Sequence, residues 1–65
     1  MRLADKIEIH QHVLEKLIIQ RNKSWVKLSK ATTHSQSLEY LQALSNICLE
    51  EIATRNTLND LYEER

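Results

Sequence analysis

The residues best suited to acid–base or metal chemistry lie near the start of the chain, where His10 and His12 stand among carboxylates. Residues two apart on a helix point about 200° away from each other, so these imidazoles do not share one metal ion. His12 is four residues after Glu8 and three before Glu15, which predicts a carboxylate–histidine cluster on a polar face. Di-metal sites in helical bundles use inward-facing Glu-x-x-His pairs, the reverse of the order found here. We therefore expect no metal site, and metal binding in a bundle stays a second alternative function.

Cys48 is the only cysteine, so the chain forms no internal disulfide. A thiol nucleophile needs a nearby base that helps to form the thiolate. The nearest histidine along the chain is His34, which belongs to the expected turn and lies far from Cys48 along the helix axis. We interpret Cys48 as a small buried apolar residue. The sequence thus predicts no catalytic residue and no cofactor, and the protein is not expected to be an enzyme.

Two arginines interrupt the apolar rows of the chain and need partners if they are buried. Across an antiparallel pair of helices, Arg21 would face Glu50, and Arg55 would lie near Glu8 or His12. No second basic or aromatic residue converges on either arginine. We therefore predict structural ion pairs rather than a ligand site.

A basic flank near the middle of the chain is the best candidate for contact with nucleic acid. Lys16, Lys23, Lys27 and Lys30 recur on one side of a helix, and Trp25 lies among them. Lysines at this spacing neutralise phosphates. The competing interpretation is an ordinary solvated helix face, with Trp25 buried in the core. A nucleic-acid-binding regulator is therefore the first alternative function.

These residues must be positioned by helices, because the chain has no glycine and no proline. Most tight turns and phosphate-binding loops depend on those two residue types. The one break in the helical pattern is the small polar stretch Ala31-Thr-Thr-His-Ser-Gln-Ser37, in which Thr33 and Gln36 have the spacing of a capping box. Such residues favour caps and turns over helix interiors.

The pattern predicts an all-α fold, an antiparallel helical hairpin that forms a single domain over residues 1–65. The first helix is expected over about 3–30, the turn over about 31–36 and the second helix over about 36–63. One continuous helix is the rival, since no glycine or proline forbids it. It would leave its apolar surface bare outside a long coiled coil, and the apolar residues do not keep a strict heptad.

The apolar residues exceed what one hairpin can bury. At 100° per residue, the core face of the first helix is a row that includes His10, which we interpret as a core-edge histidine bonded to a neighbour. Two further apolar residues, Ile19 and Val26, lie on nearly the opposite side. The row on the first helix comprises Leu3, Ile7, His10, Leu14, Leu17, Ile18, Arg21, Trp25 and Leu28.

The second helix carries two apolar rows separated by about 100°. Isolated surface apolar residues need no explanation, but several in one direction indicate an interface. We expect the first row to form the core and the second to bind protein, together with Ile19 and Val26. The first row comprises Leu38, Leu41, Leu44, Cys48, Ile52 and Tyr62, and the second Tyr40, Ala43, Ile47, Leu58 and Leu61.

A 65-residue chain has a marginal core and, with no disulfide, usually gains stability by association. We therefore expect a homodimer that forms a four-helix bundle. Nine basic residues balance nine acidic ones, which lowers the expectation of a phosphate-led mechanism. The predicted function is that of a non-enzymatic, self-associating regulator or adaptor that binds a larger protein through its helix faces. No apolar run is long enough for a membrane span, and we expect a cytoplasmic protein without membrane contact.

Overall fold

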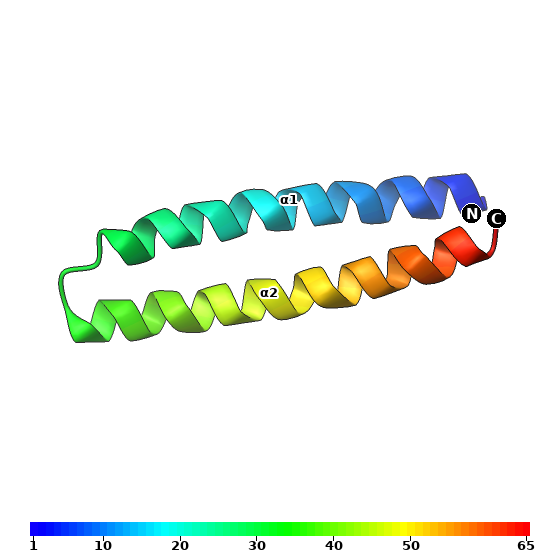
Figure 1. Ribbon diagram of the computed structural model, residues 1–65. Helices are drawn as coiled ribbons and strands as arrows, with labels where there is room; N and C mark the ends of the chain where they lie inside the picture. Colours follow the sequence, from blue (N-terminus) through cyan, green and yellow to red (C-terminus); the bar gives the residue numbers. More distant parts are fainter.

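The computed structural model describes residues 1–65 as two antiparallel helices, and the predicted all-α hairpin is confirmed. Helix α1 spans Leu3–Ser29 and helix α2 spans His34–Glu63 (Figure 1). They pack side by side along their whole length in a rod of 48 × 15 × 14 Å, with both chain ends at the end opposite the turn. Neither helix is long and apolar enough to cross a membrane.

The turn between the helices is short and uses no unusual backbone conformation. No residue has a positive φ, so the missing glycines are not needed. Thr33 is extended and caps α2, since its Oγ1 accepts a hydrogen bond of 3.1 Å from the Gln36 amide. The Gln36 side chain accepts from the Thr32 amide at 3.2 Å, one residue before the position expected for a capping box. Helix α2 therefore begins two residues earlier than the expected position 36.

The residues that are buried or half-buried between the two helices are spaced alternately three and four positions apart along each helix. This heptad spacing keeps one row of each helix turned toward its partner, as in a coiled coil. The apolar residues alone do not keep a strict heptad, as expected, because polar residues such as His10, Arg21 and Glu51 occupy several positions of the repeat. We call these two rows the seam. It comprises Leu3, Ile7, His10, Leu14, Leu17, Arg21, Ser24, Leu28 and Ala31, and Ser37, Tyr40, Leu44, Ile47, Glu51, Thr54, Leu58 and Leu61.

The hydrophobic core within the seam is thin. Ile7, Leu58 and Leu61 form a buried cluster near the chain ends, against which Leu3 and Leu14 pack. No side chain is completely shielded from solvent. The hairpin therefore has one line of apolar contact and little buried volume beside it.

Several residues of the two apolar rows of α2 lie where the other row was expected, although Leu44 is buried as predicted. Leu58 and Leu61, expected on the outside, are buried, whereas Leu38, Leu41 and Ile52, expected in the core, are exposed. A row traced at 100° per residue drifts by about 20° per heptad from the coiled-coil seam, or roughly 80° over four heptads. That drift moves a row from one side of the seam to another.

Trp25 on α1 also lies outside the core in which it was expected. It is 55% exposed, because the seam passes through Ser24 instead. The large aromatic ring therefore lies beside the line of contact between the helices, where it is available to a partner.

Replacement of Thr33 with Ala should destabilise the hairpin, because the amide of Gln36 loses its capping acceptor. The expected loss is about 1 kcal/mol, and for a small domain about 4–8 °C in melting temperature. Thermal unfolding followed by circular dichroism measures it. Ser35→Ala is the matched control, since its hydroxyl makes no hydrogen bond; equal melting temperatures for the two variants would contradict the role of the cap.

Candidate interaction face and its ion-pair network

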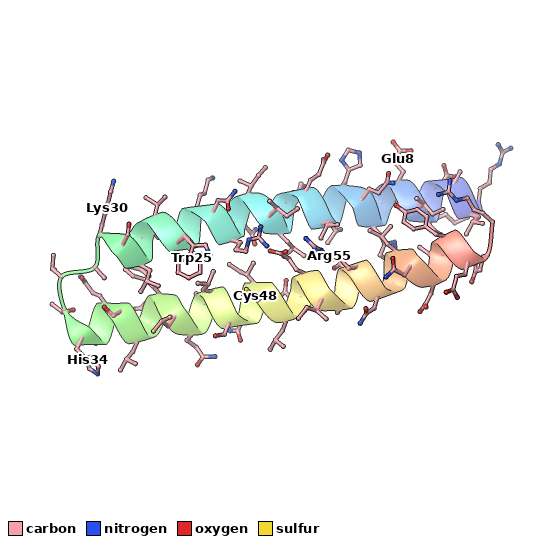
Figure 2. The ribbon with its side chains drawn as sticks, viewed as in Figure 1. Glu8, Trp25, Lys30, His34, Cys48 and Arg55 are labelled. Carbon is pink, nitrogen blue, oxygen red and sulfur yellow. The ribbon has the colours of Figure 1, made fainter.

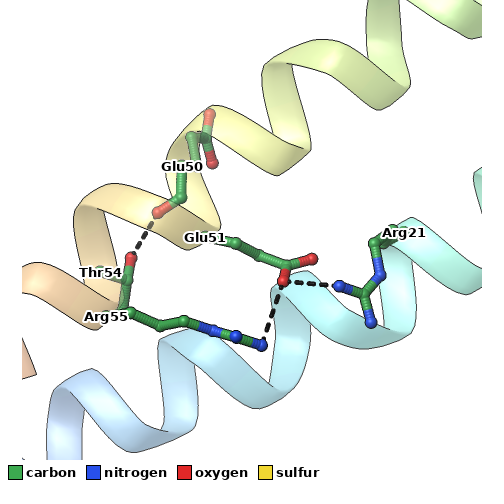
Figure 3. A network of polar contacts seen from close by, with 5 residues as sticks. All are labelled: Arg21, Glu50, Glu51, Thr54 and Arg55. Atoms are coloured by element: carbon green, nitrogen blue, oxygen red, sulfur yellow. Dashed lines mark hydrogen bonds and ion pairs between the residues drawn. The ribbon is translucent and has the colours of Figure 1, made fainter.

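A buried carboxylate flanked by two arginines lies midway along the seam (Figure 3). The Arg21 guanidinium donates to Glu51 Oε2 at 2.8 Å, and Arg55 approaches the same oxygen to 3.6 Å from one turn further along α2. The Glu51 side chain is only 5% exposed, against 32% for Arg21 and 55% for Arg55. The network therefore carries a net positive charge that is only partly shielded from solvent.

The partners predicted for both arginines are corrected by this geometry. Arg21 pairs with Glu51 and not with Glu50, because the heptad places position 51 in the seam and position 50 outside it. Arg55 also pairs with Glu51, within its own helix, and not with Glu8 or His12. The more general prediction, that both arginines form ion pairs within the chain, is confirmed.

The second oxygen of Glu51 has no hydrogen-bond partner although it is buried. An unsatisfied buried charged group costs free energy, and buried ion pairs often contribute less than an apolar layer of similar volume. The network is thus a weak source of stability. Its position makes it a better determinant of register, since a carboxylate tolerates few neighbours in a seam.

Apolar side chains gather on one side of the hairpin, which we call the side face. It consists of Ile18 and Trp25 on α1, and Leu38, Leu41, Cys48 and Ile52 on α2. Ile18, Trp25, Leu41 and Cys48 each follow a seam residue directly in the sequence, and in an antiparallel pair these positions flank the seam on the same side.

The hydrogen bond of 2.9 Å from Gln11 to the Tyr62 hydroxyl belongs to the same flank and joins the two helices across it. Trp25 and Arg55 appear between the two ribbons in Figure 2, while Lys30 and His34 point away from the opposite helix. Cys48 is half-buried and has no histidine beside it in the seam or the side face.

The opposite flank of the seam is polar. On this flank, the residues that directly precede a seam residue are mostly charged or amide-bearing, with Val13, Ala43 and Thr57 as exceptions. They comprise Lys6, Val13, Gln20 and Lys27 on α1, and Gln36, Ala43, Glu50, Thr57 and Glu64 on α2. The hairpin therefore has one apolar and one polar flank.

The seven residues predicted as a protein interface are not brought together. Tyr40 and Ile47 are half-buried in the seam, and Leu58 and Leu61 are buried there. Ala43 is exposed on the polar flank, while Ile19 and Val26 are exposed on the outer surface of α1. Trp25, Leu38, Leu41 and Ile52, which sequence reasoning placed in the core, are exposed instead, and the heptad spacing of the seam is the signal that distinguishes them from core residues.

The four lysines of the basic flank all remain exposed. Lys16 and Lys23 are one heptad apart on α1, and Lys30 follows a further heptad on, directly after the helix ends. None of them takes part in an ion pair, since every ion pair of the chain involves arginine or histidine. The flank is therefore free to meet an anionic partner.

The histidines occupy positions with ordinary partners. The exposed His12 lies 3.9 Å from Glu8 and 3.7 Å from Glu15, the cluster expected on the polar face. His10 is half-buried, and its Nδ1 donates to the Lys6 carbonyl at 2.7 Å, because a carbonyl only accepts. No group of three or more His, Cys, Asp or Glu side chains is placed to hold a metal ion.

Replacement of Arg21 with Leu should lower the free energy of unfolding by roughly 1–3 kcal/mol, because Glu51 then keeps only the longer contact to Arg55. Replacement of both Arg21 and Glu51 with Leu should recover this loss, since an apolar layer replaces the buried charges. Urea unfolding at one fixed protein concentration measures both values. A double variant less stable than Arg21→Leu would show that the network stabilises the fold in its own right.

Comparison with protein-family models, with curated protein sequences and with solved structures finds no match for this chain.

Proposed function

We propose that this protein is a non-enzymatic helical interaction protein that self-associates through the side face. The observation that carries the proposal is the gathering of exposed apolar side chains on that one flank. Trp25, Leu38, Leu41 and Ile52 are each 44–58% exposed there, and they come from both helices. Contiguous apolar surface of this kind marks sites of protein association.

The total surface area supports the same proposal. The hairpin exposes 5075 Å², whereas a compact monomer of 7.7 kDa exposes about 4,300 Å². The excess of roughly 700–800 Å² is close to the ~800 Å² that each partner buries in a standard protein interface. One partner of similar size is therefore enough to cover the excess.

The energy of covering the side face sets an upper limit on the strength of self-association. Burial of the exposed half of a large apolar side chain contributes roughly 1 kcal/mol, and two copies together offer eight such side chains. Association costs an estimated 4–15 kcal/mol, which offsets part or all of that gain. These terms leave at most about 4 kcal/mol, which corresponds to a dissociation constant of about 1 mM, so we expect weak, reversible association rather than a permanent dimer.

Replacement of Leu41 with Glu should weaken self-association at least tenfold, because a charge then has to be buried in the side face. Sedimentation equilibrium from micromolar to millimolar concentrations measures the dissociation constant. Leu49→Glu is the matched control: Leu49 is 65% exposed on the outer surface of α2 and should leave the constant unchanged. A wild-type protein that stays monomeric throughout this range would sink the proposal.

Binding of nucleic acid through the basic flank is the second candidate function. It is favoured by the absence of ion pairs at Lys16, Lys23, Lys27 and Lys30, which leaves their charges unneutralised within the chain. The side face lies on a different flank of the hairpin, so the two functions are compatible.

Mobility-shift titrations at several salt concentrations test this candidate. Four phosphate contacts predict that log K falls with log[salt] with a slope of about −3 to −4. The triple change of Lys16, Lys23 and Lys30 to Gln should reduce that slope, whereas Lys6→Gln, about 15 Å from Lys16 along the axis of α1, should not. No binding at low salt, or binding insensitive to salt, would remove this candidate.

A further inference from the structure

We propose that the side face binds a second copy of the chain whose two-fold axis runs parallel to the long axis of the hairpin. This arrangement rests on the proposed function and specifies its partner. It places α1 of each copy against α2 of the other, with both turns at the same end of a four-helix bundle. Neighbouring helices are then antiparallel throughout.

Only two symmetric arrangements bring identical side faces together with the helices aligned, because the two-fold axis must lie in the plane between the faces and run either along or across the hairpin. An axis along the hairpin superimposes the turn end of one copy on the turn end of the other. An axis across the hairpin superimposes the turn end of one copy on the open end of the other, and places α1 on α1 and α2 on α2.

The uneven spread of apolar residues along the hairpin favours the axis along it. Trp25, Leu38 and Leu41 lie in the half nearest the turn. Toward the open end, the same rows carry Gln11, Asn59 and Tyr62 instead. An axis across the hairpin would cover apolar side chains with polar groups that lose water without gaining partners. An axis along the hairpin covers apolar groups with apolar groups and polar groups with polar groups.

Charge complementarity favours the same axis. The row of α1 that borders the side face carries two acids, Glu8 and Glu15, whereas the bordering row of α2 carries Leu38, Ser45, Ile52 and Asn59 and no acid. On the α2 side, Arg55 is half-exposed and belongs to a network with a net positive charge.

The register of the hairpin brings these opposite charges to one level. Two cross-helix hydrogen bonds, Gln11 to Tyr62 and Arg21 to Glu51, bracket both Glu15 on α1 and Arg55 on α2. An axis along the hairpin therefore sets Glu15 of each copy beside Arg55 of the other. An axis across it would leave Arg55 facing a row without carboxylates, at the cost of burying an uncompensated charge.

Distance measurements between spin labels test the arrangement on the full chain. The label is attached to Thr32→Cys, in the turn, in a Cys48→Ala background, and the matched variant Arg2→Cys places it at the open end. With both turns at one end, equal labels should lie about 10–25 Å apart, the separation of neighbouring helices in a bundle. Turns at opposite ends would separate the Thr32→Cys labels by nearly the 48 Å length of the hairpin.

A mixture of the two labelled variants provides the reciprocal measurement, in which the proposed dimer gives the long distance between unlike labels. A dimer with long distances between like labels would overturn this arrangement and leave the proposed function standing. A monomer both in these samples and in the wild-type protein, whose Cys48 belongs to the side face, would overturn both.

The charge contact has its own test. Glu15→Lys should weaken dimerisation at least several-fold, because two lysines then meet two arginines, while Glu63→Lys, remote from the side face, should not. An unchanged dissociation constant for Glu15→Lys would overturn the proposed contact.

Discussion

Two helices packed in a hairpin share a single line of contact, and the rest of this structure depends on that constraint. One seam buries one row of each helix, so every other apolar residue must stay at the surface. Here the seam is further weakened by His10, Arg21 and Glu51, while Trp25, Leu41 and Ile52 lie just outside it. The chain thus has several polar residues within an otherwise apolar seam and large apolar residues beside it, which a self-sufficient hairpin would not require.

The polar residues in the seam help to fix how α1 is aligned against α2, which apolar residues do less well. A shift of one heptad between the helices would set Glu51 seven residues away from Arg21 along α1, opposite leucine positions of the seam. A buried carboxylate without its arginine is costly, whereas leucines tolerate many neighbours. The same argument applies between hairpins, because Arg55 extends the network toward the side face.

Several parts of the fold follow from residue types and local spacing. The polar stretch before Ser37 marks the turn, and Thr33 with Gln36 marks the start of the second helix, because capping depends on neighbours in the sequence. Local spacing could not predict that Trp25 is exposed and Leu58 is buried. Their positions depend on a supercoil of 3.5 residues per turn, and a small difference in period accumulates along a helix of 30 residues. The predicted partner of Arg21 was wrong for the same reason, because an error of one residue in the position of the seam is enough to select Glu50 instead of Glu51.

The backbone of this hairpin places no demand for a special residue at any position. No peptide bond is cis and no φ is positive, so no site requires glycine or proline. The fold is specified by a pattern of apolar and polar side chains in steps of three and four, which very different sequences can satisfy. Homologous chains are therefore free to diverge in identity while they keep the spacing. The trace of common descent would be found in the phase of the heptad and in the Arg21–Glu51 layer, more than in strings of matching residues.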